Sequence, residues 1–171
     1  VAGDLGDTLD LDFGAPIPAL RAFQTGAALE SYLLIVPGEQ LATIYDKWGA
    51  RLLEANVRSF LQARAKTNKG IQKTIREEPD LFFPYNNGLS ATADAVSCVR
   101  TDDGLAVASI SNLQIVNGAQ TTGSIHAGLK SAKEQLPQVF VQMKLTVVPP
   151  ERSEEIVPKI SEYANTQNKV N

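Results

Sequence analysis

The stretch that decides the fold is Gln114-Ile115-Val116-Asn117-Gly118-Ala119-Gln120-Thr121-Thr122. The apolar run that ends here, Val107–Val116, predicts a buried strand, and Asn117-Gly118 is typical of the turn that closes it. The residues Thr121–Gln135 predict a helix, with Thr121 as a candidate N-cap. A strand, a glycine turn and a helix start together direct backbone N–H groups at one point, which suits an anion.

Two further amide-rich turns, Tyr85–Gly88 and Asn165–Asn168, resemble this one in composition. We expect the three turns to meet at one end of a sheet and to form a polar ligand site with almost no titratable groups. Amide side chains pair well with base edges and do not transfer protons. The candidate ligand-binding residues are Asn86, Asn87, Gly88, Asn117, Gly118, Gln120, Thr121, Thr122, Asn165, Gln167 and Asn168.

A structural interpretation of the same turns stays open. Gly118 suits a left-handed conformation in a simple strand-to-helix connection, and a threonine would cap the helix. Asparagine side chains also tie neighbouring loops together through hydrogen bonds. The amides could therefore hold the loops in place without binding a ligand.

The rest of the chain predicts a mixed order of helices and strands. Strands are expected over Ser31–Val36, Leu89–Val99, Leu105–Val116 and Phe140–Val148, and helices over Gly38–Trp48, Asn68–Glu77 and Arg152–Tyr163. Leu9 and Leu11 alternate with aspartates, which allows a short edge strand, and Asn86-Asn87-Gly88 is typical of a hairpin turn. This order favours an α+β fold, a mixed β-sheet with flanking helices.

Composition sets the class of protein. A chain of 171 residues fits one domain, and its net charge of -3 gives no general attraction to nucleic acid or membrane. The single cysteine excludes an internal disulfide and favours the cytoplasm. No apolar run approaches the roughly 20 residues of a membrane helix, so we expect no membrane partner. We expect residues 1–30 to be an N-terminal extension or a remnant of a preceding segment, and residues 31–171 to be a domain truncated at its C-terminus.

One basic segment stands out in this acidic chain. Its residues and their neighbours, the candidate nucleic-acid-binding set, are Arg58, Arg64, Lys66, Lys69, Lys73 and Arg76. A local patch of this kind could contact phosphates. The alternative is the solvated face of a helix.

The residue types needed for catalysis are scarce. His126 and Cys98 are the single histidine and the single cysteine, so they cannot complete a metal site. The carboxylates lack the clustering of a two-metal nuclease, and we find no nucleophile with a base. We therefore predict no catalytic residue, no metal site and no cofactor in this chain, and leave open whether the protein is an enzyme.

Five motifs occur in an order that resembles a known family. They are Asn56–Leu61, Asn68–Ile71, Phe83–Leu89, Ile115–Thr122 and Asn165–Asn168. Over Ser31–Asn171 the chain resembles the AIPR domain, named for abortive-infection phage-resistance proteins of bacteria. The resemblance implies a cytoplasmic role in defence against phage or foreign DNA. Members of this family often carry a nuclease-like segment ahead of the domain, and residues 1–30 do not resemble one.

The Asn117–Thr122 turn is also similar, more distantly, to the DGQHR turn of DNA-modification proteins and to ParB-like folds. There the turn cradles nucleotide phosphates, which implies a ParB-like arrangement here. Thr121-Thr122 stands where those motifs carry His-Arg, so the arginine that would clamp a phosphate is missing.

Three functions follow from these observations. The first is a domain of an anti-phage protein that recognises DNA, RNA or a nucleotide through the amide turns. The second is part of a nuclease or nucleotide hydrolase whose catalytic segment lies outside this chain. The third is a structural or oligomerisation domain.

Overall fold

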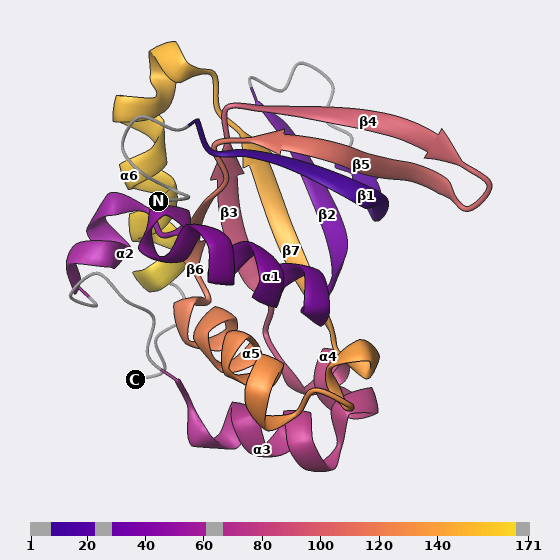
Figure 1. The fold of residues 1–171 in the computed structure, drawn as a ribbon. Helices are drawn as coiled ribbons and strands as arrows, with labels where there is room; N and C mark the ends of the chain where they lie inside the picture. The colour runs from indigo at the N-terminus through magenta and orange to yellow at the C-terminus, as the bar shows by residue number, and fades with distance from the viewer. Residues whose placement is uncertain (1–7, 23–28, 61–66, 167–171) are drawn as a thin grey trace.

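The sheet of this protein is mixed, as the sequence predicts. The computed structural model describes residues 8–22, 29–60 and 67–166, and Figure 1 shows their arrangement. Seven strands form the sheet in the order β4-β5-β1-β2-β7-β3-β6. Strand β3 pairs parallel to β7, and the other named pairs are antiparallel. The strands are β1 (Asp10–Arg21), β2 (Glu30–Pro37), β3 (Leu89–Ala93), β4 (Ala95–Thr101), β5 (Gly104–Ser111), β6 (Gln114–Asn117) and β7 (Phe140–Val147).

Helices cover one face of this sheet, which makes the fold α+β. They are α1 (Gly38–Trp48), α2 (Ala55–Phe60), α3 (Lys69–Glu77), α4 (Phe82–Tyr85), α5 (Ala119–Ser131) and α6 (Pro150–Thr166). Short 3₁₀ turns are η1 (Gly49–Leu52), η2 (Pro79–Leu81) and η3 (Leu136–Gln138). Helix α1 crosses the sheet, α5 packs beside α1, and α3 packs on the far side of α5 (Figure 1).

Alternation along β2 shows why the core forms between the sheet and α1. Tyr32, Leu34 and Val36 are buried, whereas Leu33 and Ile35 face outward. The buried set joins side chains of α1, α5 and β7 in one apolar cluster. Each fully buried side chain of this size contributes about 1.5–3 kcal/mol to folding.

Strand β1 is not the short edge strand that the sequence allowed. It lies inside the sheet, where its first residues pair with β5 and its last residues pair with β2. Leu9 and Leu11 are buried in the core. The pairing register shifts between Asp12 and Ile17, and an irregularity of this kind accommodates a proline, which cannot donate to the ladder.

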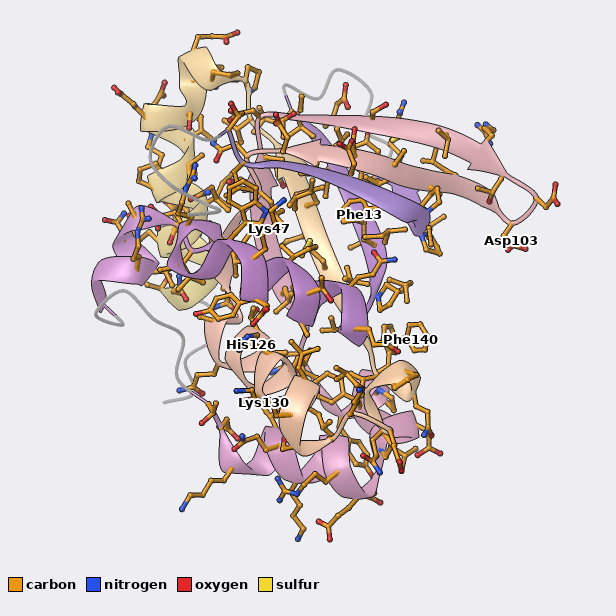
Figure 2. The ribbon with its side chains drawn as sticks, in the orientation of Figure 1. Phe13, Lys47, Asp103, His126, Lys130 and Phe140 are labelled. Atoms are coloured by element: carbon orange, nitrogen blue, oxygen red, sulfur yellow. The ribbon has the colours of Figure 1, made fainter. Side chains whose placement is uncertain are left out.

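The sequence predicted one continuous strand over Leu89–Val99 and another over Leu105–Val116, and this prediction is wrong. Each breaks at a bend, at Asp94 on one strand and at Asn112 on the other. Asn112 adopts the left-handed conformation that asparagine tolerates, with φ 54°, and its Nδ2 lies 3.4 Å from Asp94 Oδ1. The bent ribbon therefore supplies both edge strands, β4 and β6, and its β4–β5 end carries Asp103 at the tip (Figure 2).

Two predicted turns have different structures. The segment Asn86-Asn87-Gly88 is not a hairpin, because helix α4 precedes it, and Asn86 Oδ1 instead accepts a bond from Gly88 N at 2.8 Å. Helix α5 begins at Ala119, so Thr121 is not its N-cap. Gly118 holds that position with φ 101°, the left-handed conformation predicted for it, and the helix ends at Ser131, before the predicted Gln135.

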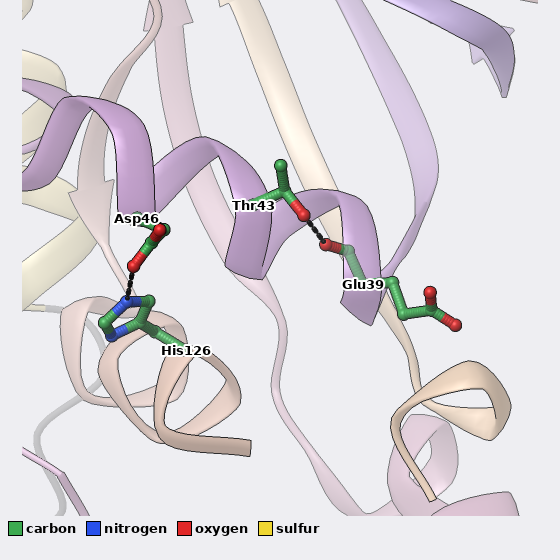
Figure 3. A network of polar contacts seen from close by, with 4 residues as sticks. All are labelled: Glu39, Thr43, Asp46 and His126. Atoms are coloured by element: carbon green, nitrogen blue, oxygen red, sulfur yellow. Dashed lines mark hydrogen bonds and ion pairs between the residues drawn. The ribbon is translucent and has the colours of Figure 1, made fainter. Parts of the chain in front are cut away.

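A polar contact joins the two helices over the core. His126 Nε2 of α5 lies 2.9 Å from Asp46 Oδ1 of α1, and the His126 ring meets the Tyr45 ring edge-on, with centroids 5.1 Å apart (Figure 3). Nearby on α1, the Thr43 hydroxyl donates to the Glu39 carbonyl (Figure 3). The single histidine thus serves the packing of α5 on α1.

The Gly88→Ala variant tests the close approach of the Asn86–Gly88 turn to β7. Gly88 has φ 86°, and an added Cβ would lie 2.7 Å from the Gln142 carbonyl oxygen. We expect a loss of roughly 2–4 kcal/mol in the free energy of unfolding, measured by urea denaturation. The control Gly104→Ala has φ 114° and no atom within 4 Å of the added Cβ, so its loss should stay near 1–2 kcal/mol. Equal losses would contradict the argument.

Candidate functional site

Two of the amide-rich turns and the C-terminal end of helix α6, where Asn165 and Thr166 lie, meet at one cleft of about 840 Å³. It lies where β6 passes into α5, with the turn before β3 on one side and α6 on another. The candidate ligand-binding residues that line it are Asn86, Asn87, Gly88, Asn117, Gly118, Gln120, Thr121 and Asn165. Gln167 and Asn168 lie outside the described residues.

Thr122 has a different place from the rest of the candidate set. Its side chain is fully buried, and its hydroxyl donates to the Gly118 carbonyl at 3.1 Å. It stabilises the first turn of α5 beneath the cleft and does not line it. Its neighbour Thr121 does line the cleft, although most of its surface is buried.

Asn165 fastens helix α6 to the end of β6. Its Nδ2 donates to the Val116 carbonyl at 2.8 Å and to the Ser161 carbonyl at 2.7 Å, and its Oδ1 accepts from Asn117 Nδ2 at 2.8 Å. Both ends of this amide are therefore engaged within the protein. Asn165 is a structural tie at the cleft wall.

Asn86 and Asn68 tie other loops to the start of α5. Asn86 Nδ2 donates to Thr121 Oγ1 at 3.2 Å, while Asn68 Nδ2 lies 3.4 Å from Gln120 Oε1. Asn68 also caps α3, because its Oδ1 accepts from Ile71 N at 3.0 Å. These contacts are the loop ties that the structural interpretation of the amides expects.

Other polar groups of the cleft form no side-chain hydrogen bond with the described residues. Asn56 and Asn87 are exposed, and neither side chain forms a hydrogen bond with the part of the chain that the structure describes. The ties described above use Asn117 Nδ2 and Gln120 Oε1, and they leave Asn117 Oδ1 and Gln120 Nε2 available to a ligand. The cleft thus combines a fixed frame with amide groups that can meet a ligand.

The sequence-based prediction of the site missed ten of the described lining residues, and Tyr85, Asn56 and Glu162 are three of them. Tyr85, whose side chain is 60% exposed, and Asn56 both belong to motifs that the sequence singles out. Glu162 gives no such indication, because it reaches the cleft only when α6 docks beside β6. Among the described lining residues it is the one with a formal charge.

The candidate basic residues do not all share one surface. Lys69, Lys73 and Arg76 are exposed on α3, where Lys73 Nζ lies 4.0 Å from Glu77. Arg58 of α2 instead lines a second cavity of about 420 Å³, whose walls also include Arg51 and Glu54. Arg64 and Lys66 lie outside the described residues.

The described residues offer neither a metal cluster nor a membrane-spanning helix. Within residues 8–22, 29–60 and 67–166, no group of three or more His, Cys, Asp or Glu side chains could hold a metal ion. In the same ranges, no helix has both the length and the apolar character needed to cross a membrane.

The cleft lies within a region that matches a known family. The family described as AIPR protein matches residues 53–171, from just before α2 to the end of the chain. This chain belongs to the AIPR family. Its cleft-lining residues, from Asn56 to Thr166, all fall inside the match. No curated protein and no solved structure shows significant similarity to the chain.

Membership of the AIPR family supports a role in abortive infection, the form of phage defence for which the family is named. The match begins at residue 53, later than the Ser31 that the motifs suggested. The family that the order of the motifs indicated is the family that the match identifies.

The Asn165→Asp variant tests the tie between α6 and β6. A carboxylate cannot donate to the Val116 and Ser161 carbonyls, so we expect a loss of about 1–3 kcal/mol in the free energy of unfolding. Amide hydrogen exchange in α6 should also become faster. The control Asn87→Asp adds the same charge at an exposed amide without side-chain bonds to the described residues, and it should change stability by less than about 0.5 kcal/mol. A similar loss in both variants would show that charge, not the tie, is responsible.

Proposed function

We propose that this chain is the ligand-recognition domain of a phage-defence protein, and that its amide cleft binds a nucleobase. The base belongs to a free nucleotide or to a DNA or RNA strand. The observation that carries the proposal is the convergence of the Asn86–Gly88 turn, the Asn117–Gly118 turn and Asn165 of α6 on one cleft. The family match supports the defence role and leaves the ligand open.

The chemistry of the cleft fits a base better than it fits a phosphate group. Its volume of about 840 Å³ falls in the range of small-molecule pockets. Free amides such as Asn87 can form paired hydrogen bonds with a base edge. The exposed ring of Tyr85 offers a surface on which a base can stack.

Phosphates attached to that base would meet neutral donors. Gly118, the N-cap of α5, has no side chain to occupy the first backbone N–H groups of the helix. These groups carry the positive end of the helix dipole. The cleft lining contains no lysine or arginine among the described residues, so this contact would be weak.

A structural role is the second candidate, and a specific observation favours it. The amide of Asn165 is fully engaged within the protein, and Asn86 is engaged at both ends as well. This role accounts for the frame of the cleft. It does not account for Tyr85 and Asn87, which are exposed two positions apart in sequence and line the same cleft.

The Tyr85→Ala variant tests base binding. We expect nucleoside monophosphates or short single strands to bind about tenfold more weakly to this variant, because stacking on an aromatic ring contributes roughly 1–3 kcal/mol per base. Isothermal titration calorimetry measures the change. The control Phe83→Ala removes a nearby exposed aromatic ring that does not line the cleft, and it should leave affinity unchanged. Absence of binding by the unmodified chain would favour the structural role.

The three exposed basic residues of α3, Lys69, Lys73 and Arg76, predict how binding of a longer strand should depend on salt. Each neutralised phosphate lowers the slope of log affinity against log salt by about 0.7 on single strands and 0.9 on duplex DNA, so three contacts give roughly -2 to -3. The Lys69→Ala, Lys73→Ala double variant should flatten this slope. The matched control Lys133→Ala, Lys144→Ala removes two exposed lysines outside α3 and should leave the slope unchanged. An unchanged slope in the α3 variant would identify that face as solvated surface.

A further inference from the structure

The wall of the cleft that α6 forms presents a carboxylate. Glu162 is exposed, and its side chain forms no hydrogen bond or ion pair with the described residues. Asn165 lies three positions later on the same helix, so the two side chains stand about one turn apart on one face. Because Asn165 bonds Asn117, the Asn117 amide lies at the same wall.

The hydrogen bonds of Asn165 fix which way the Asn117 amide points. Asn165 must direct Nδ2 at the carbonyls of Val116 and Ser161, since only a donor can bond them. Its Oδ1 therefore faces Asn117, and Asn117 Nδ2 donates to it at 2.8 Å. The Oδ1 atom of Asn117 is what remains for a ligand, and it is an acceptor.

Two acceptors at one wall call for a ligand with two adjacent N–H donors. Guanine has such an edge, because its ring N1–H lies beside its exocyclic amine. Adenine and cytosine instead place an amine beside a ring acceptor, and uracil and thymine have one N–H between two carbonyls. A base edge that contains an acceptor would place that atom's negative partial charge against the Glu162 carboxylate, and the two would repel each other.

We infer that the cleft selects guanine, with Glu162 and Asn117 Oδ1 accepting from its N1–H and exocyclic amine. This inference rests on the proposed base-binding function of the same cleft. A hydrogen bond to a carboxylate is stronger than one between neutral groups, so Glu162 would make the larger contribution. Its negative charge also keeps phosphates away from this wall, which turns the base toward α6.

Gln120 completes the pattern that guanine requires. Its Oε1 lies 3.4 Å from Asn68 Nδ2, which leaves its own Nε2 as a donor at the cleft. The guanine O6 acceptor sits next to N1–H and needs such a donor. Acceptors on α6 and β6 and a donor on α5 thus match the donors and the acceptor of one base.

The experiment compares 5′-monophosphates of guanosine, inosine, adenosine, cytidine and uridine by titration calorimetry on the whole chain. We expect the guanosine nucleotide to bind at least tenfold more tightly than the others. Inosine lacks the exocyclic amine and should fall below guanosine for that reason alone. The Glu162→Gln variant should lower guanosine affinity about tenfold or more, and it should not weaken adenosine binding, because the unfavourable contact between the carboxylate and the adenine acceptor is removed.

A matched variant shows whether the effect requires loss of the charge at Glu162 or follows from loss of any negative charge on α6. Glu155→Gln makes the same change at an exposed site on α6 that does not line the cleft, and it should leave every affinity unchanged. Equal binding of all the nucleotides, or a Glu162→Gln variant that still prefers guanosine, would overturn the guanine assignment and leave base binding standing. Absence of binding by every nucleotide would overturn both proposals together.

Discussion

The left-handed turn at Gly118 is the constraint on which the rest of the structure depends. Gly118 has φ 101°, and a Cβ at this position would collide with the side chain of Leu89 on β3. This close approach lets β6 end beside β3 and lets α5 start at once, directed back over the core. The edge strand of the sheet, β6, and the helix α5 thus join at Gly118, a residue without a side chain.

The amides around this turn divide into two groups. Those of Asn86 and Asn165 bond the protein itself and hold two turns and helix α6 in fixed relative positions. Those of Asn56 and Asn87 face the cleft without such bonds to the described residues. A fixed frame lowers the cost of ordering the site when a ligand binds, because the loops are already in place. The structural and the ligand-binding interpretations therefore apply to different residues of one cluster.

Local sequence patterns predicted the elements whose formation depends on local contacts. The strand over Ser31–Val36 and the helix over Gly38–Trp48 were found in place, since apolar spacing decides both. The α3 helix begins after Asn68, which caps it. The class of the fold also followed from the sequence.

Features that depend on distant contacts could not be predicted in this way. The bends at Asp94 and Asn112 were not predicted, because apolar residues resume directly after each of them and no glycine or proline marks the break. Strand β1 becomes an inner strand through pairing with Val107 and other residues of β5, far along the chain. Glu162 reaches the cleft through the docking of α6, which no local pattern encodes.

The pairing of β2 with β7 has a consequence for how the chain folds during synthesis. Glu30 pairs with Val147, and Pro37 pairs with Phe140, so β2 must wait for almost the whole described chain before its partner exists. Contacts so far apart in sequence slow folding, because a long loop must close first. Until then the apolar side chains of β2 are exposed in the emerging polypeptide, which makes this interval the one most open to aggregation.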